Sequence, residues 1–146
     1  MIMDSLNEFA DGQSIAAVAS TILATNQIDM QEAKDIGNGQ PVYLVIQIDT
    51  AVVGTSSTIN FRLRSDSSAA IHATTSTAHI ETGAIAEATL VAGYQVVIPL
   101  PIEGNVYERY LGVQAIIGTA TTSAGAFSAF LTLDPIGWKS YPDATN

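Results

Sequence analysis

Residues 42–65 read VYLVIQIDTAVVGTSSTINFRLRS, and both ends of this stretch alternate apolar and polar residues. The apolar positions are Leu44, Ile46 and Ile48 in the first half and Ile59, Phe61 and Leu63 in the second. Successive side chains of a strand point to opposite faces, so this alternation is typical of a strand with one buried face. The pattern therefore predicts strands over residues 42–49 and 58–65.

The connection between these two strands, residues 50–57, is short and contains Gly54, which favours an antiparallel hairpin. In such a hairpin Arg62 and Arg64 face Gln47 and Asp49 across the ladder. The sequence equally allows a solvated face for the two arginines, where ion pairs contribute little. Both remain candidates for contact with a partner.

Further short strands are expected over residues 79–85, 95–100, 107–117 and 125–133, and Pro99 and Pro101 end the second of these or mark a sheet edge. The intervening segments are rich in Gly, Ser and Thr. We expect a hairpin loop at residues 118–125 and a longer polar connection at residues 64–77. Short strands separated by turns at this spacing predict an all-β fold, a single-domain antiparallel β-sandwich of about eight strands.

The N-terminal third is ambiguous. Ile15, Val18, Ala19 and Ile22 fit a helical stripe, but the β-branched residues around them fit a strand, and we predict a strand. Gln31–Asp35 is expected to form one helical turn, followed by a turn at residues 38–41.

The composition indicates one domain with a weakly charged surface. A chain of 146 residues can build its own core. Only 13% of the residues are charged, against about 25% in an average protein. There is no cysteine, so no disulfide or thiolate zinc site is expected.

The charge distribution bears on possible partners. The net charge is −9, and the five basic residues are Lys34, Arg62, Arg64, Arg109 and Lys139. Five cations scattered along the sequence cannot form the basic stripe that phosphate binding needs. Nucleic acid is therefore not an expected partner. The N-terminus lacks a basic region and no apolar run reaches the ~18 residues of a membrane span. We expect a protein that is made in a cytoplasm and does not enter a membrane.

Catalytic motifs are absent from the sequence, and no enzyme activity or cofactor is expected. His79 and Glu81 share one face of a predicted strand, with His72 in the preceding loop, which a metal could use. Because zinc sites need three or four ligands, we interpret them as a surface pair and expect no metal. Glu103 and Glu108 are interpreted as solvated loop acids.

Short motifs in a fixed order run through most of residues 1–134. They are Met-Ile-x-Asp at 1–4 with Phe9, Asp11 and Gln13, Ile28-Asp29, AKDIG at 33–37, Pro41, TLVAG at 89–93, Arg109-Tyr110-Leu111 and GAFSAFLTLD at 125–134. In this order they resemble the capsid cement, or decoration, proteins of tailed bacteriophages. The resemblance implies a jelly-roll on the outer capsid surface of the virion. It also implies a homodimer or homotrimer that ties neighbouring major capsid protein subunits together.

Two terminal segments are candidates for partner contact. We expect the sandwich domain to span residues 1–134, with an N-terminal arm at about residues 1–14, and a tail to span residues 135–146. Leu6 and Phe9 have the spacing of one helical face, which favours packing of the arm on its own domain with some partner contact. In the tail, Trp138 and Tyr141 could anchor in a neighbour or close the end of their own sandwich.

A carbohydrate-binding or receptor-binding module is the alternative, because a fold does not determine a function. Sugar sites usually present Trp or Tyr faces, and this chain has one Trp and 7% aromatic residues.

Overall fold

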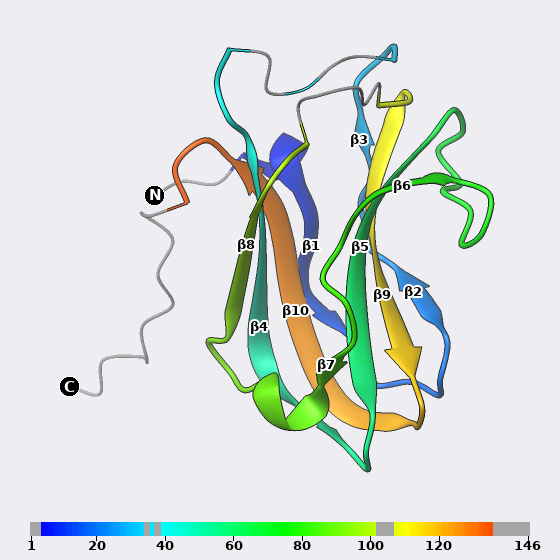
Figure 1. The fold of residues 1–146 in the computed structure, drawn as a ribbon, viewed down its shortest axis with the longest axis vertical. Coiled ribbons are helices and arrows are strands. Elements are labelled where there is room, and N and C mark those ends of the chain that lie inside the picture. The colour runs from blue at the N-terminus through cyan, green and yellow to red at the C-terminus, as the bar shows by residue number, and fades with distance from the viewer. Residues whose placement is uncertain (1–3, 34–35, 37–38, 102–106, 136–146) are drawn as a thin grey trace.

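The computed structural model describes residues 4–33, 36, 39–101 and 107–135. They form two antiparallel β-sheets packed face to face (Figure 1). The strands are β1 (Glu8–Ser14), β2 (Thr21–Leu23), β3 (Ile28–Asp29), β4 (Tyr43–Gly54), β5 (Thr58–Asp66), β6 (Thr77–Glu81), β7 (Ile85–Ala86), β8 (Gln95–Pro99), β9 (Tyr110–Gly118) and β10 (Thr122–Thr132). Two short 3₁₀ helices accompany them, η1 (Ser5–Asn7) and η2 (Glu87–Thr89).

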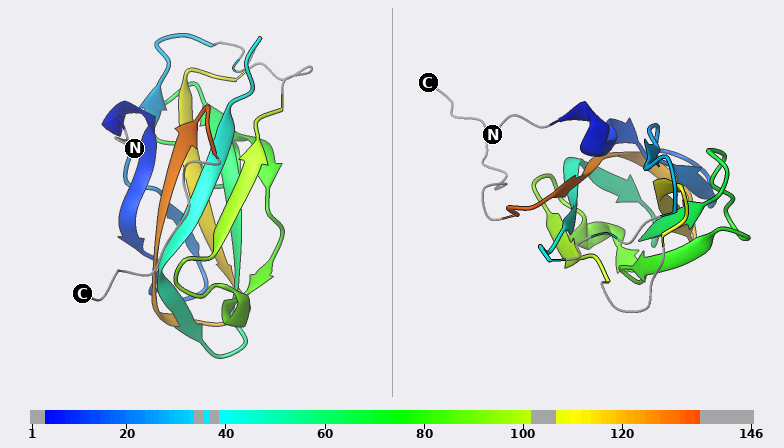
Figure 2. Two further views of the ribbon diagram at one scale, coloured as in Figure 1. Left: turned by 90° about the vertical axis from the view of Figure 1, so that its left-hand side faces the viewer. Right: turned by 90° about the horizontal axis from the view of Figure 1, so that it is seen from above.

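The strand order is that of a jelly-roll. One sheet has the order β1-β10-β4-β8; the other has β2-β9-β5-β6, with β3 also paired to β9 and β7 to β5. Eight strands make up the two four-strand paths, and the end-on view in Figure 2 shows the two layers facing each other. The predicted all-β jelly-roll sandwich is therefore confirmed.

Most of the predicted strands are confirmed with shifted ends. β4, β5, β8 and β10 lie where alternation placed them, and β9 begins at Tyr110 rather than Tyr107. The strand expected over residues 79–85 is divided into β6 and β7. β8 is the last strand of its sheet, so the prediction that Pro99 marks a sheet edge is also confirmed.

The predicted hairpins at residues 50–57 and 118–125 are wrong. β4 and β5 lie in different sheets, as do β9 and β10, so both connections cross the sandwich. Consequently Arg62 pairs with Glu81 and Gln114, not with Gln47 or Asp49. Short connections suit a crossing between facing layers as well as a hairpin, which is why loop length misled the prediction.

The strand predicted around Ile15–Ile22 is also wrong for most of its length. The extended segment ends at Ser14, residues 17–20 form bends, and β2 begins only at Thr21. The backbone groups of Ile15 and Ala17 bond instead to β10, mainly through the Thr122 hydroxyl. Gln31 and Glu32 form a bend rather than a helical turn, and Lys34 and Asp35 lie outside the described residues.

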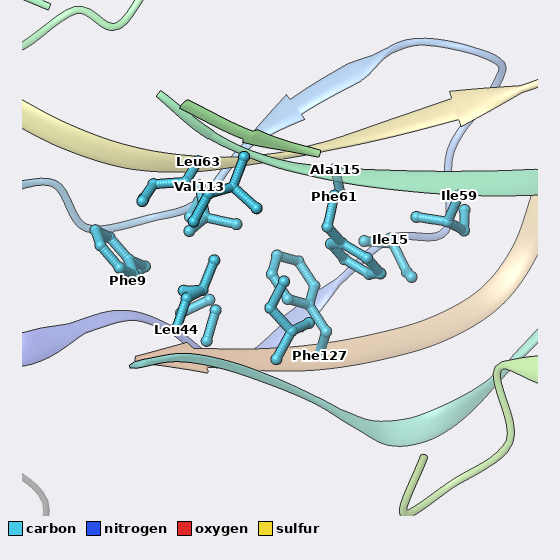
Figure 3. Close-up of a cluster of buried hydrophobic side chains, with 14 of the residues drawn as sticks. Phe9, Ile15, Leu44, Ile59, Phe61, Leu63, Val113, Ala115 and Phe127 are labelled. Carbon is cyan, nitrogen blue, oxygen red and sulfur yellow. The ribbon is translucent and has the colours of Figure 1, made fainter. Parts of the chain in front are cut away.

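The core lies between the sheets and consists of the apolar residues that the alternation singled out. Phe61 of β5 and Phe127 of β10 meet at the centre with ring centroids 5.2 Å apart (Figure 3). Leu44, Leu63 and Val113 pack beside them and are at most 1% exposed. Each such side chain contributes about 1.5–3 kcal/mol when fully buried, so this layer holds the sheets together.

One glycine permits the close approach of β10 to the segment that follows β1. Gly125 has φ +139°, and a Cβ there would lie 3.0 Å from Ile15 Cγ1 and 3.1 Å from Val52 Cγ2. A side chain at this position would therefore crowd Ile15 and Val52 and strain the backbone. Among the described residues, no helix has the length and apolar character to cross a membrane.

Candidate interaction site

A surface cleft lies at one end of the sandwich. Residues 5–8, 25–29 and 31 line a volume of about 840 Å³ between η1 and the β2–β3 segment. Leu6 is its most exposed apolar side chain at 75%. Figure 2 shows η1 at this end, next to the start of β1.

Hydrogen bonds order both walls of the cleft, one within the η1 segment and the others between residues 25–26 and β1. Asp4 Oδ1 accepts the N–H of Leu6 at 3.0 Å and caps η1. Gln13 Oε1 accepts the N–H of Thr25 at 2.7 Å, and Asn26 N–H donates to the Phe9 carbonyl at 2.9 Å. The cleft is therefore a built feature of the fold and not a gap between loose loops.

An ion pair borders the cleft. Arg109 donates from Nε and Nη2 to the two carboxylate oxygens of Asp29, each at 2.8 Å, and lies 4.8 Å from the Tyr110 ring centre. The hydrogen bonds from Arg109, together with one from Gln31 N–H, lower the pKa of Asp29 to about 2, while Asp29 raises the pKa of Arg109. Both groups stay charged at any physiological pH.

The structure separates the two predicted contact residues of the N-terminal arm. Leu6 lies on the surface in the cleft, whereas Phe9 is fully buried in the core. The phenyl ring is enclosed because residues 8–14 form β1, a strand of the sandwich itself. Phe9 is therefore a core residue and not a partner contact, and Leu6 stays a prediction.

The arginines of β5 are also separated. Arg62 Nε lies 2.9 Å from Glu81 Oε1, an ion pair that lacks hydrogen-bond geometry, and its side chain is 26% exposed. Arg64 is only 6% exposed, because its Nη1 donates to the Ser76 carbonyl at 3.0 Å and to the Ser76 hydroxyl at 3.1 Å. Arg62 stays a candidate contact, whereas Arg64 fastens its own loop.

The loop that buries Arg64 covers the outer face of the β2-β9-β5-β6 sheet. Ile71 sits over Gly112, where an added Cβ would lie 2.7 Å from Ile71 Cδ1. Gln114 beside it is 1% exposed and donates to the His72 carbonyl at 3.4 Å. The chain therefore occupies much of this face itself.

His79 packs against its own domain, whereas His72 is exposed. His79 Nε2 lies 2.7 Å from Ser65 Oγ, its ring centre lies 4.3 Å from that of Tyr107 with the ring planes tilted by 40°, and burial lowers its pKa. Glu81 pairs with Arg62 instead of facing a shared ion with His79. Within the described residues no cluster of three or more His, Cys, Asp or Glu side chains could hold a metal.

The predicted tail contacts Trp138 and Tyr141, and the acid Glu103, lie outside the described residues. Sequence reasoning missed the Asp29–Arg109 pair and the role of Ile71. The two charged residues are 80 positions apart, and the only local signal was that Arg109 opens a strand rich in apolar residues.

One known protein family matches most of this chain. The family model described as Bbp16 matches residues 9–131. The chain belongs to the Bbp16 family, a phage-related family. No curated protein matches it.

The matched segment runs from β1 almost to the end of β10, so the family shares the whole sandwich. η1 with Leu6 precedes the match, and Trp138 and Tyr141 follow it. The candidate contacts at both ends of the chain therefore lie outside the part that the family model describes.

Proposed function

We propose that this Bbp16-family chain is a capsid cement protein on the outer surface of a tailed-phage head. In this proposal it binds across seams between major capsid protein subunits, as a homo-oligomer and without catalysing a reaction. The observation that carries the proposal is the family match over the entire sandwich, because it links the whole fold and not a short motif to phage-related proteins.

The fold suits a mechanical role. Its sheets are joined by a continuous apolar core, and loops on several sides are tied down, as Arg64 ties residue 76 and Gln13 ties residue 25. A stiff body that contacts both sides of a seam raises the free energy needed to open it. Several weak contacts on one rigid oligomer then act at high effective concentration.

The charge is compatible with crowding on a shell. A net charge of −9 favours solubility before assembly. Repulsion between neighbouring copies is screened over about 8 Å at physiological salt. The cleft with Leu6 is our candidate for one capsid contact, since it places an exposed leucine beside several amide side chains and two carboxylates, Glu8 and Asp29.

The sugar-binding alternative has little support in the described part of the chain. Four of its aromatic side chains, Phe9, Phe61, Tyr107 and Phe127, are fully buried. Tyr43, Tyr94 and Tyr110 are half-buried and Phe130 is 3% exposed. Among these residues there is no open aromatic platform on which a sugar ring could stack.

Cosedimentation tests the proposal directly. Purified chain is mixed with assembled shells lacking it, or with free capsid subunits, and bound chain is quantified. We expect saturable binding to shells only, and shells that resist a higher temperature once decorated. Equal binding to free subunits, or binding to an oligosaccharide array without binding to shells, would contradict the proposal.

Two matched variants locate the contact. Leu6 and Val18 are exposed to similar extents, 75% and 66%. We expect Leu6→Asp to weaken shell binding at least about tenfold, a difference of about 1.4 kcal/mol, and Val18→Asp to bind as the wild type. Equal binding of the two variants would remove Leu6 from the contact surface.

A further inference from the structure

Among the described residues, the outer strands are β1 and β8 in one sheet and β2, β3, β6 and β7 in the other, and all except β8 are irregular, short or charged. β3 and β7 have only two residues each. β1 has two register shifts and carries Glu8 and Asp11; β2 has three residues; β6 has a register shift and ends at Glu81. Irregularity, brevity and charge are the usual means by which an edge avoids pairing with another strand. β8 has none of these three features; its one protective residue is Pro99 at its last position.

β8 is a regular and neutral edge. It pairs with β4 in unbroken register from Gln95 to Pro99, and no charged residue occurs over positions 88–101. Figure 1 shows it at the margin of its sheet. Within the described ranges no strand pairs with its other side.

The backbone of β8 has a defined set of groups on the open side. Leu100 N–H donates to the Val42 carbonyl at 2.8 Å, and Tyr94 accepts from Ile48 N–H at 2.9 Å. Because bonding alternates along an antiparallel strand, the even-numbered residues face β4. Gln95, Val97 and Pro99 therefore direct their backbone groups away from the sheet, with N–H donors at the first two positions only.

We propose that this edge pairs with β8 of a second copy, antiparallel and about a twofold axis at Val97. Val97 then exchanges both backbone hydrogen bonds with the partner's Val97, and Gln95 N–H donates to the carbonyl of the partner's Pro99. Proline has no N–H, so the bond that Pro99 would return to the carbonyl of the partner's Gln95 is missing in this register. Both outward donors of each copy are used, and the two four-stranded sheets become one.

The chemistry of the edge favours a second copy as the occupant. A twofold contact presents the same patch from both sides, so the patch must complement itself. Val97 is 40% exposed, lies opposite Val45 of β4 and is flanked along β8 by Val96 and Ile98. Two copies therefore meet at this edge without like charges facing each other, although each chain has a net charge of −9. The β8 edge is then the contact surface of the homo-oligomer in the proposed function, and the inference rests on that proposal.

The test uses the full chain in sedimentation equilibrium, with hydrogen exchange of the Val97 amide. Val97→Lys places two like charges at the axis, and Val97→Pro removes the outward donor without touching a bond to β4. Val91→Lys is the control, since Val91 is 54% exposed and precedes the strand. We expect a dimer for the wild type and the control, at least about tenfold weaker dimerisation for both Val97 variants, and Val97 protection that rises with protein concentration.

Other occupants give different results. Protection of Val97 in a monomer means that the chain's own residues 136–146 cover the edge, and protection only on shells means that a capsid strand does; either result overturns the inference. So does a dimer that survives Val97→Lys. A monomeric wild type that still binds shells contradicts the dimer alone, whereas a dimer that ignores shells contradicts the cement function alone.

Discussion

β1 and β8 border the same sheet, yet the chain treats them differently. β1 bends away from a regular ladder at Gly12, whose φ is +56° and whose N–H donates to Ser128 Oγ at 2.9 Å, and it carries two acids. β8 is straight in register and neutral. Such irregularity keeps an edge unpaired, and in our proposal the regular edge is the one that pairs with a second copy.

The largest predicted difference between the two edge strands is the loss of unfolding free energy when one side chain of each is truncated to alanine. Phe9 of β1 is fully buried, whereas Val97 of β8 is 40% exposed. We expect Phe9→Ala to lower the free energy of unfolding by about 3–5 kcal/mol, because it leaves a cavity in the core. Val97→Ala should change it by less than about 1 kcal/mol. Urea denaturation at low protein concentration measures both, and equal losses would show that β8 is as deeply anchored as β1.

A smaller effect is expected from the bend in β1. Gly12 has open space around its missing Cβ, so Gly12→Ala tests the backbone conformation alone. The left-handed φ costs a residue with a Cβ about 1–2 kcal/mol, and thermal unfolding should show this loss. Gly12→Asn is the matched control, since asparagine tolerates this region better than alanine. If alanine and asparagine behave as glycine does, the bend is not under conformational constraint.

The smallest expected effect concerns the connection that leads into β8. Glu87 of η2 accepts hydrogen bonds from the Ser56 and Ser57 N–H groups, at 3.0 and 2.7 Å, and from the Ser57 hydroxyl. The bonds from Ser57, hydroxyl first, lower the pKa of Glu87 from its usual 4.5. The carboxylate therefore stabilises the fold fully above about pH 4.5, and this stabilisation is lost as the pH falls through the lower folded-state pKa.

Glu87→Gln is expected to lower the melting temperature by about 2–4 °C at pH 7, because an amide NH₂ then faces an N–H donor. The difference from wild type should shrink as the pH falls below 4. Asp11→Asn on β1 removes the same charge from an exposed side chain and serves as the control. A difference that stays constant down to pH 3 would mean that the carboxylate is not what holds this turn.

Local sequence patterns predicted the positions of most strands correctly, but they did not predict which strands pair with each other. Alternation at Leu44, Ile46 and Ile48 and at Ile59, Phe61 and Leu63 located two strands and assigned their core faces correctly. The same pattern cannot distinguish a hairpin from a crossing between layers, because both put alternate residues inside. The failure at Ile15–Ile22 has the same origin, since a loop that packs on β10 is as apolar as a strand.

The candidate site was predictable only in part. An exposed Leu6 near the chain start was within reach of the sequence, but the spacing of Leu6 and Phe9 wrongly put them on one face of a helix. Arg64 looked like any surface arginine until the loop carrying Ser76 and Ile71 proved to fold over it. Burial of a long polar side chain depends on a distant loop, which periodicity does not register.

The sequence by itself determined that this is an all-β protein with one apolar core and few charges, since periodicity and composition are local properties of the chain. The tertiary structure decided which strands became neighbours and therefore which edge is unpaired within the described residues. Strand pairing joins residues as far apart as β1 and β10, and the free energy that selects it comes from burying both sheets at once, a quantity that no single segment contains.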